Sequence, residues 1–585
     1  MAAFLAALPS VRFSFAGDDT LLIVENPGIH TLSAIPQLFT EDFFARPVAG
    51  VPKTGGIGYY RPLTKATFAV DWALWGRSAA GFHATQVAIH VGAALLFFLC
   101  LVELLGPTRW AYLWAIVFAA YPSHPQAVGL INARSDLLCA LGMLLACLGS
   151  LKRRWAWIAL GIAVSLFSKE TGIFAAPLAA LALWIRPERT KRLMPSIRAC
   201  IITPLLILAF RSIAFRPDLP PSTHAHTSTS WFILAGQSLG AHLFALTGLA
   251  TADLRLVLLP ASPFSAAVLL GWIASLTLLM GAAYFTLRRD PRGLGLAWVA
   301  LGLLQLLFVH RIQIPLPGVL VPLHERWTYI PSLGLCLFAA AASSSARAPR
   351  VWILTGLGAA LIALYALRIE DYRDNRSMAM RELRQLRTTA PEHLPPPLRA
   401  KRWQMEGTLA AQAKEYSRAL DLLQKSLTLD ADNPVTLMNL ASVYLETGSP
   451  RRAAMLLERS LAPQKVSTDG SVDTFVVDDA LARNRPERYA LLAYAYERLD
   501  YTNAAEKALR SALEGDPNNA SYALNLGAFF ARHHRWTEAK MAYVRATDIS
   551  PCYKKALEAL RTLASIEKDS ISMARWNLSL QECGT

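Results

Sequence analysis

Apolar runs long enough to cross a membrane recur from the start of the chain to about Arg368, and none follows Glu370. A helix needs about 20 apolar residues to span the hydrocarbon core of a bilayer. Counting a weaker segment at residues 1–15, the pattern predicts an all-α polytopic bundle of about eleven spans. The other runs lie at 84–105, 110–122, 136–151, 155–168, 171–185, 199–215, 263–287, 294–310, 328–346 and 351–367.

The first apolar segment is short for a span, and it contains Pro9 and Arg12. We expect either a tilted first helix or a chain shortened by a misplaced start codon. A cleaved signal peptide is disfavoured, because a polar motif begins immediately after this segment.

Basic residues between the apolar runs define an orientation, since loops rich in Lys and Arg stay on the cytoplasmic side of a membrane. Clusters of such residues occur at 152–154, 186–198, 288–292 and 347–350. All four clusters lie on the cytoplasmic side only if residues 231–258, which include Gln237, His242 and Asp253, do not cross the membrane. We therefore expect an interfacial amphipathic helix there, and the C-terminal half of the chain on the external side.

Composition agrees with a membrane protein, with 54% hydrophobic residues, 17% charged residues and a mean hydropathy of +0.32. The net charge of +16 does not indicate nucleic acid, because the basic residues of the first half lie in short connections. The seven cysteines form no Cys-x-x-Cys pair, so neither a zinc site nor a disulfide framework is indicated. Cys552 and Cys583 could pair if the C-terminal half lies in an oxidising compartment.

The predicted orientation places many ionisable side chains at the external face. Such groups are costly at span ends unless they are hydrated or paired, so their gathering predicts a shared polar cavity. Any one of them could instead cap a helix or extend to the interface. The set is Asp18, Asp19, Arg61, His124, Arg134, Asp136, Lys169, Glu170, His310, Glu325 and Arg326.

Small residues in the C-terminal half recur with a period of about 34, the length of the tetratricopeptide repeat (TPR). The pattern predicts a TPR α-solenoid with repeats at about 400–433, 434–467, 486–519 and 520–553, an insertion at 466–479 and a capping helix at the end. The predicted domains are 1–369 for the membrane bundle, 370–399 for a linker and 400–585 for the TPRs. We expect the array to recruit a peptide or protein on its concave face; the alternative is that it only dimerises the chain.

Short motifs follow one another along the membrane half. They are GDDTLLIVENP at 17–27, YYRPLT at 59–64, GFHATQVAIH at 81–90, YPSHPQAVGLINARSDLL at 121–138, FSKETGI at 167–173 and HERWTYIPSLGLCL at 324–337. Their order, followed by TPRs, resembles the transmembrane-and-TPR-containing protein O-mannosyltransferase family, which has the GT-C fold. The resemblance covers nearly the whole chain, and a composition rich in Ala, Leu and Arg is compatible with a bacterial member.

The chain departs from this family in its fourth motif. The family usually has His-Pro-x-His followed by Thr-Glu, where this chain has YPSHPQ at 121–126. Tyr121 and Gln126 thereby replace an imidazole and a carboxylate with groups that do not titrate near neutral pH. If the family uses those groups to contact the acceptor or a metal, the specificity of this protein differs.

Glycosyl transfer from a polyprenyl phosphate to a hydroxyl needs a carboxylate to take the acceptor proton, and cations to hold the departing phosphate. One carboxylate suffices for an inverting transfer, because phosphate is already a good leaving group. Asp18 or Asp19 is the candidate catalytic base. The resemblance implies the same pair, because GT-C enzymes carry their catalytic acid in the first external loop.

The other candidates bind the donor phosphate or support the residues that do. Arginine is favoured for forked contacts to phosphate oxygens, and a tyrosine hydroxyl can donate to them. The phosphate candidates are Arg61, Arg134, Lys169, Arg326 and Tyr329; Asp136, Glu170 and Glu325 are expected to neutralise cations, and His124 to contact a substrate or cap a helix. The sequence indicates no metal cluster, although an acidic pair can hold a divalent ion.

These expectations describe an integral membrane glycosyltransferase that uses a polyprenyl phosphate sugar and requires no further cofactor. It would move mannose or another hexose to Ser or Thr hydroxyls of exported proteins recruited by the TPRs. In a bacterium it would lie in the inner membrane with periplasmic TPRs, and in a eukaryote in the endoplasmic reticulum with lumenal TPRs. The alternatives are a GT-C transferase for a lipid or glycan acceptor, and a membrane-anchored TPR scaffold without activity.

Overall fold

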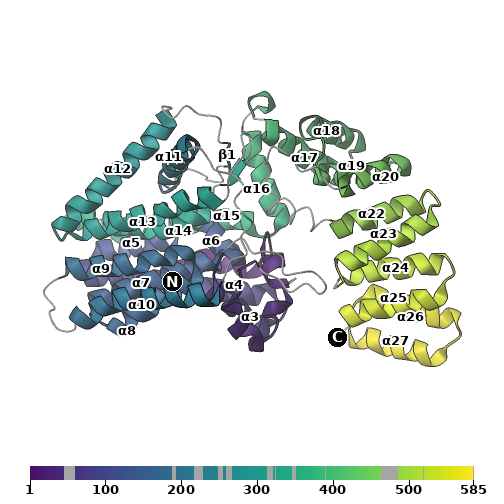
Figure 1. The fold of residues 1–585 in the computed structure, drawn as a ribbon, viewed down its shortest axis with the longest axis horizontal. Helices are drawn as coiled ribbons and strands as arrows, with labels where there is room; N and C mark the ends of the chain where they lie inside the picture. The colour runs from purple at the N-terminus through teal and green to yellow at the C-terminus, as the bar shows by residue number, and fades with distance from the viewer. Residues whose placement is uncertain are drawn as a thin grey trace. The chain divides into compact units, whose positions relative to one another are not determined.

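The computed structural model describes residues 1–583 except 25, 45–58, 187–192, 216–227, 248–254, 258–265, 313–319, 323, 345–350, 389, 395, 463–484 and 518. The chain divides into two compact units, Met1–Gln385 and Leu386–Thr585 (Figure 1). The boundary between them falls within the range 370–399 that the sequence predicts as a linker.

The first unit is built from helices that follow the apolar runs. Its α-helices are α1 Ala2–Ala7, α2 Ile35–Leu38, α3 Pro62–Trp75, α4 Ala79–Leu105, α5 Arg109–Ala119, α6 Pro125–Gly129, α7 Arg134–Leu151, α8 Trp155–Ser168, α9 Ala175–Ile185, α10 Leu193–Ala214, α11 Ser228–Ala245, α12 Ala266–Leu287, α13 Pro291–Ile312, α14 Tyr329–Ser343, α15 Val351–Ile369 and α16 Asn375–Arg387. Short helical turns are η1 Leu8–Arg12, η2 Thr20–Val24, η3 Pro27–Ile29, η4 Leu32–Ala34, η5 Ile131–Ala133, η6 Glu170–Phe174, η7 Glu325–Thr328 and η8 Glu370–Tyr372. Proline starts α3 and α6, where its missing N–H is not needed.

Four helices among the described residues are long and apolar enough to cross a membrane: Ala79–Leu105, Ile131–Leu151, Leu193–Ala214 and Val268–Leu287. The span that contains α7 is largely buried inside the unit, whereas α10 and α12 expose most of their length. Shorter apolar helices lie at Ala2–Arg12, Trp155–Ser168 and Glu170–Ile185. The helical class is confirmed, and the count of about eleven spans stays a prediction.

Helix α7 packs against α8, α4 and α9. Glycines permit the close approach to α8. A Cβ atom placed on Gly142 would lie 2.6 Å from the carbonyl oxygen of Gly161, and one placed on Gly161 would meet the backbone of Ala146. Small residues at helix crossings are the usual means of such packing in membranes. The contact fixes α7, whose N-terminal end carries the polar side chains described below.

The stretch expected at the membrane interface forms helix α11 in its described part, and α11 packs against α12 and α13. Two short strands, β1 Arg255–Val257 and β2 Leu320–Pro322, pair antiparallel with Leu256 opposite Val321. These strands depart from a purely helical expectation. Residues 248–254 and 258 lie outside the described residues, and the interfacial position of this stretch stays a prediction.

The second unit consists of paired helices (Figure 1). After the turn η9 Pro391–His393 come α17 Pro396–Gln412, α18 Tyr416–Leu429, α19 Pro434–Glu446, α20 Pro450–Leu461, α22 Arg485–Glu497, α23 Thr502–Gly515, α24 Ala520–Arg532, α25 Trp536–Ile549, α26 Lys554–Ile566 and α27 Ser570–Glu582. The turn inside each pair contains one residue with positive φ: Lys414, Gly448, Asp500, His534 and Lys568. Positions 500, 534 and 568 are 34 residues apart. The expected single capping helix is therefore a fifth helix pair with the geometry of a repeat.

The small residues of the repeat pattern allow the helices of a pair to approach each other. A Cβ atom on Gly527 of α24 would lie 2.5 Å from the ring of Tyr543 on α25.

Asn433 caps α19, because its Oδ1 accepts from the N–H of Thr436 at 3.0 Å. The predicted insertion at 466–479 lies outside the described residues.

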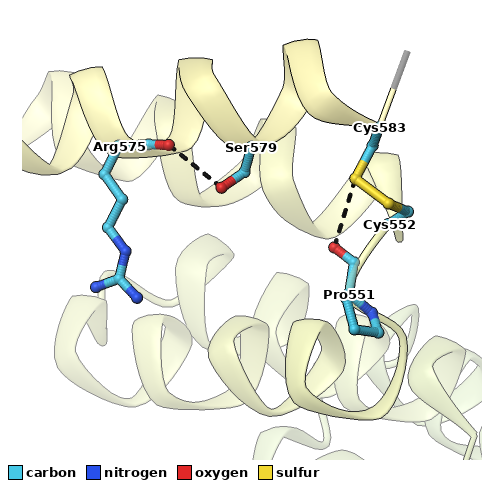
Figure 2. The surroundings of a disulfide bond; sticks show 5 residues. All are labelled: Pro551, Cys552, Arg575, Ser579 and Cys583. Atoms are coloured by element: carbon cyan, nitrogen blue, oxygen red, sulfur yellow. Dashed lines mark hydrogen bonds between the residues drawn. A yellow bond between two sulfur atoms is a disulfide. The ribbon is translucent and has the colours of Figure 1, made fainter. Parts of the chain in front are cut away.

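A disulfide joins Cys552 to Cys583, 31 residues further along the chain (Figure 2). It ties the residue after the last helix, α27, to the connection between α25 and α26. The sequence allows this pair only in an oxidising compartment. The other cysteines, Cys100, Cys139, Cys147, Cys200 and Cys336, are free and buried.

Candidate functional site at the N-terminal end of helix α7

Asp19 is completely buried and accepts three backbone hydrogen bonds. Its Oδ1 accepts from the N–H of Asn132 at 2.6 Å, and its Oδ2 accepts from Ile131 at 3.3 Å and Ala16 at 3.2 Å. Burial raises the pKa of Asp19 to about 7, against the opposing effect of these hydrogen bonds. The carboxyl group thereby holds the turn η5, immediately before α7, to the first loop.

Asp18 has different surroundings from its neighbour, because its side chain is partly exposed. Gly17 precedes it with φ +59°, a left-handed conformation that favours glycine. The N–H of Gly17 donates to Oδ1 of Asn375 at 2.7 Å. The turn at Gly17 therefore leads into two adjacent carboxylates, of which one is buried and the other partly open.

Arg326 is connected to Asp19 through Asn132. Its Nη1 donates to Oδ1 of Asn132 at 2.9 Å, and the backbone N–H of Asn132 donates to Asp19. The backbone N–H of Arg326 donates to Oε1 of Gln126 at 2.9 Å. Within the described parts of the chain Arg326 has no carboxylate partner, and its buried Nε has no hydrogen-bond acceptor. Its charge is therefore not neutralised by a neighbouring acid there.

Arg61 and Lys169 are each paired with an acid near the same helix end. Arg61 makes a forked contact with Glu170, whose Oε2 accepts from Nη2 at 2.9 Å and from Nε at 3.1 Å. Nη1 of Arg61 lies 3.5 Å from Oγ of Ser135 on α7. Lys169 forms a buried ion pair with Asp136, on the first turn of α7. Glu170 and Asp136 thus lie where they neutralise these two cations.

Arg134 begins α7, and its side chain is completely enclosed. Its Nη1 lies 2.6 Å from Oδ2 of Asp71 on α3. Its Nε donates to Oε1 of Gln86 at 3.2 Å, and its Nη2 donates to the carbonyl oxygen of Phe82 at 2.9 Å. The guanidinium therefore joins α3 and α4 to α7, and no face of it is open to a ligand.

His124 and Tyr329 belong to a buried polar chain. Nε2 of His90 faces the carbonyl oxygen of Ala119 at 3.0 Å and must donate to it, so Nδ1 of His90 accepts from the hydroxyl of Tyr329 at 2.8 Å. Nε2 of His124 lies 2.8 Å from Oγ of Ser332. The hydroxyl of Tyr329 is thus committed to His90 inside the core.

Glu325 is completely buried between two cations. Its Oε1 accepts from Nη2 of Arg368 at 2.7 Å, and its Oε2 accepts from the hydroxyl of Tyr372 at 3.0 Å and lies 3.1 Å from Nη2 of Arg381. These partners come from α15, η8 and α16. Glu325 therefore anchors the turn η7, on which Arg326 lies.

The N-terminal end of α7 and the turn before it gather most of the predicted site residues. Asp19, Arg61, Lys169 and Arg326 each contact one of the residues 131–136, and Arg134 and Asp136 belong to this helix end. Tyr329, His124 and Glu325 lie in the neighbouring networks instead. For His310 only the helical backbone is described.

Sequence reasoning missed Asn132 and Asp71. Asn132 is uncharged, and only its place inside the fourth motif could have drawn attention to it. Gln126 was singled out only as a departure from the family motif, and the structure shows that its amide oxygen accepts from the backbone N–H of Arg326. Among the residues that the structure describes, no group of three or more His, Cys, Asp or Glu side chains could hold a metal ion.

Apolar helices, a polar centre at one helix end and an array of helix pairs define a membrane protein with a TPR domain. The tetratricopeptide repeat family matches residues 410–467. Mouse protein O-mannosyl-transferase TMTC3 is 22% identical over 92% of this chain and 62% of its own length. A protein O-mannosyl-transferase of Caenorhabditis elegans is 30% identical over 28% of this chain and 24% of its own length. Tmtc1 of Drosophila melanogaster is 31% identical over 32% of this chain and 22% of its own length.

The chain is a homologue of these proteins named protein O-mannosyl-transferase, and the resemblance seen in the motifs is confirmed. It spans between 22% and 62% of the length of these relatives. The bacterial origin stays a prediction.

Proposed function

We propose that the chain is a membrane glycosyltransferase that moves mannose or another hexose from a polyprenyl phosphate to Ser or Thr hydroxyls of exported proteins. The names of its relatives support sugar transfer. One observation on this chain carries the proposal: Asn132 links the aspartate loop to Arg326, which has no carboxylate partner among the described residues. An acid and an available cation thus share one anchoring residue.

In the proposed reaction the acceptor oxygen attacks C1 of the sugar while Asp18 takes the hydroxyl proton. The bond between C1 and the phosphate oxygen breaks, and polyprenyl phosphate leaves with a negative charge that Arg326 stabilises. No second carboxyl group is needed to protonate the leaving group, unlike in glycoside hydrolysis. A single displacement of this kind inverts the configuration at C1.

Asp18, rather than Asp19, is the base in this proposal. A base must come within hydrogen-bond distance of the hydroxyl, and this geometric demand precedes any preference in pKa. Asp19 is completely buried and its oxygens already accept three backbone hydrogen bonds, whereas Asp18 is partly exposed. Asp19 is then a positioning residue, because it holds Asn132 and, through it, Arg326.

Arg326 is the proposed phosphate ligand among the cations of the site. Arg61 is paired with Glu170, Lys169 with Asp136, and Arg134 with Asp71. Each of these three would have to break an ion pair to bind a phosphate. The guanidinium of Arg326 can bind phosphate oxygens without that cost, and its planar shape permits a forked contact.

The TPR array is proposed to bring the acceptor protein to the external face of the membrane. Two observations support that location. The basic clusters between the apolar runs predict it, and the disulfide between Cys552 and Cys583 is of a kind that persists in oxidising compartments. This compartment would be the periplasm of a bacterium or the lumen of the endoplasmic reticulum.

Transfer by the purified full chain tests the proposal. The assay supplies radiolabelled mannosyl polyprenyl phosphate and a peptide rich in Ser and Thr. Asp18→Asn is expected to lower kcat by roughly 10²–10⁴-fold, because the general base is lost. Arg326→Gln is expected to raise the KM for the donor by about tenfold or more, because a charged hydrogen bond is lost. Repeating the assay with a chelator decides whether a divalent ion is needed.

Arg198→Gln is the matched control, because Arg198 is an exposed arginine near the N-terminal end of α10. It is expected to transfer sugar at the wild-type rate. Wild-type kcat in Asp18→Asn would contradict the role of the base. Label recovered on a lipid or glycan instead of the peptide would favour the alternative acceptor class, and a wild-type chain without transfer would favour the scaffold.

A further inference from the structure

Helix α10 presents an apolar surface that ends beside an arginine. Ile201, Leu205, Leu206 and Ile213 are 55%, 61%, 64% and 80% exposed. The helix is one of those apolar enough to cross a membrane, so this face is suited to contact lipid chains. Arg211 lies in the last turn of the helix, at the end that the charge pattern predicts to be external.

Arg211 is held by aromatic rings. The centre of its guanidinium lies 5.5 Å from the ring centroid of Tyr60 and 5.9 Å from that of Phe215. The hydroxyl of Tyr60 donates to the carbonyl oxygen of Phe39 at 2.9 Å, which fixes the ring. No carboxylate in the described parts of the chain pairs with Arg211. A guanidinium stacked on rings keeps its in-plane N–H groups available for an anion.

Residues 59–61 connect Arg211 to the candidate site. Glu170, the partner of Arg61, also accepts from the backbone N–H of Tyr60 at 3.1 Å. The guanidinium of Arg61 lies 4.6 Å from the ring centroid of Tyr59. Burial raises the pKa of Tyr59, Arg61 opposes that rise most strongly, and the charge of Arg326 also acts on this side chain. The segment thus lies between the end of α10 and Arg326.

We propose that Arg211 binds the phosphate of the polyprenyl phosphate donor as it enters from the bilayer, with the polyprenyl chain along the apolar face of α10. This inference rests on the proposed glycosyltransferase function. The phosphate meets the guanidinium of Arg211 first and then passes residues 59–61 to reach Arg326. Arg211 acts before the chemical step, so its loss weakens donor binding and leaves kcat close to the wild-type value.

Charge and apolar surface together select this occupant. A phosphate without a lipid chain would gain nothing from the exposed side chains of α10, and a polyprenol without phosphate would gain nothing from Arg211. Arg198, near the cytoplasmic end of the same helix in the predicted orientation, offers a matched exposed arginine. The two positions therefore separate a specific site from a general attraction between arginine and lipid.

The test uses the full chain in phosphatidylcholine nanodiscs and a fluorescent polyprenyl phosphate as probe. Wild type and Arg198→Gln are expected to bind the probe equally, and Arg211→Gln about tenfold more weakly. Arg211→Lys keeps the positive charge but cannot make a forked contact, so its affinity for the probe is expected to lie between those of the wild type and Arg211→Gln. Unlabelled polyprenyl phosphate should displace the probe at lower concentrations than polyprenol, inorganic phosphate or phosphatidylglycerol. Thermal melting of each variant confirms that it is folded.

Equal binding by wild type and folded Arg211→Gln would overturn the inference and leave the proposed function standing. Displacement by phosphatidylglycerol or inorganic phosphate as readily as by polyprenyl phosphate would also overturn it, since the site would then take any phosphate. A wild-type chain that does not bind the probe would refute the proposed function itself. In the transfer assay, a raised donor KM with unchanged kcat in Arg211→Gln supports the inference, and a lowered kcat alone contradicts it.

Discussion

The adjacent aspartates of the first loop have different surroundings. Asp19 is buried against Ile131 and Asn132, and Asp18 keeps partial contact with solvent. A buried carboxyl that accepts backbone hydrogen bonds is a strong local constraint. The acid that organises the site and the acid that is proposed to do chemistry are therefore neighbours in the chain with separate roles.

The carboxyl group of Asp19 predicts how stability depends on pH. Burial raises its pKa from 3.8 to about 7, so the folded chain keeps a proton that the unfolded chain loses. Stabilisation from this group is complete below a pH of about 3.8 and is lost as the pH rises to about 7. Asp19→Asn is expected to remove this part of the pH dependence of Tm.

The same variant is expected to lower the free energy of unfolding near neutral pH by roughly 1–3 kcal/mol, because an amide nitrogen cannot accept a backbone hydrogen bond. Its Tm should fall accordingly. Thermal unfolding between about pH 4 and pH 8 measures both effects. Asp18→Asn is the comparison variant and should keep the pH dependence with only a small shift, because the charge of Asp18 makes the smallest of the contributions that set the pKa of Asp19. A wild-type profile in Asp19→Asn would show that the buried carboxyl does not hold the loop.

Motif order and charge indicated many of the residues that gather at the start of α7, but not which of them pair with one another. Arg61, Lys169 and Arg326 are equivalent as cations in the sequence. Only the folded contacts pair the first two with acids and leave Arg326 without one in the described chain. The partner of Tyr329 is His90, which lies far away in the chain, so the hydrogen bond between them has no local sequence signal.

Helix positions follow the apolar runs, whereas helix ends follow local signals that hydropathy does not contain. The run expected at 110–122 forms Arg109–Ala119 after the capping residue Thr108, whose side chain accepts from the N–H of Ala111. The run expected at 294–310 forms a helix that begins at Pro291. Apolar runs also do not determine which helices pack against each other. The packing of α7 on α8 depends on small residues such as Gly142 and Gly161 where the two helices cross.

Gly161→Leu is expected to destabilise the first unit, because its side chain would meet the backbone of α7. Overpacking of this kind costs about 1–3 kcal/mol, and it should lower both Tm and sugar transfer. Gly356→Leu is the matched control, since a Cβ atom there meets nothing within 4 Å. Equal Tm values for the two variants would contradict the close packing of α7 on α8.

Repeat periodicity indicated the first four helix pairs of the second unit, because these pairs carry a small residue at the same repeat position and use the same kind of turn. It missed the fifth pair, α26 and α27, where Arg561 stands at the place of the small residue that Gly527 occupies one period earlier. The positive φ of Lys568 nevertheless repeats the turn. The disulfide closes this last pair onto the preceding one, and its presence is the link between the fold and the proposed external compartment.

Removal of the disulfide is expected to destabilise the end of the array. Cys552→Ser with Cys583→Ser should lower the stability of the second unit by roughly 2–4 kcal/mol, because a closed loop no longer restrains the unfolded chain. Urea unfolding of the full chain measures the change, and reductant should lower the stability of the wild type only. Thiol labelling of the denatured wild type should modify the five free cysteines before reduction. Labelling of all seven cysteines before reduction would contradict the bond.

The most direct test of the central claim is the intact mass of an exported Ser- and Thr-rich protein that is co-expressed with this chain. With the wild-type chain the acceptor is expected to carry added hexose masses, and with Asp18→Asn the unmodified mass alone. Arg198→Gln should give the wild-type spectrum. Hexose masses of equal abundance with wild type and Asp18→Asn, or no added mass with any variant, would contradict the account.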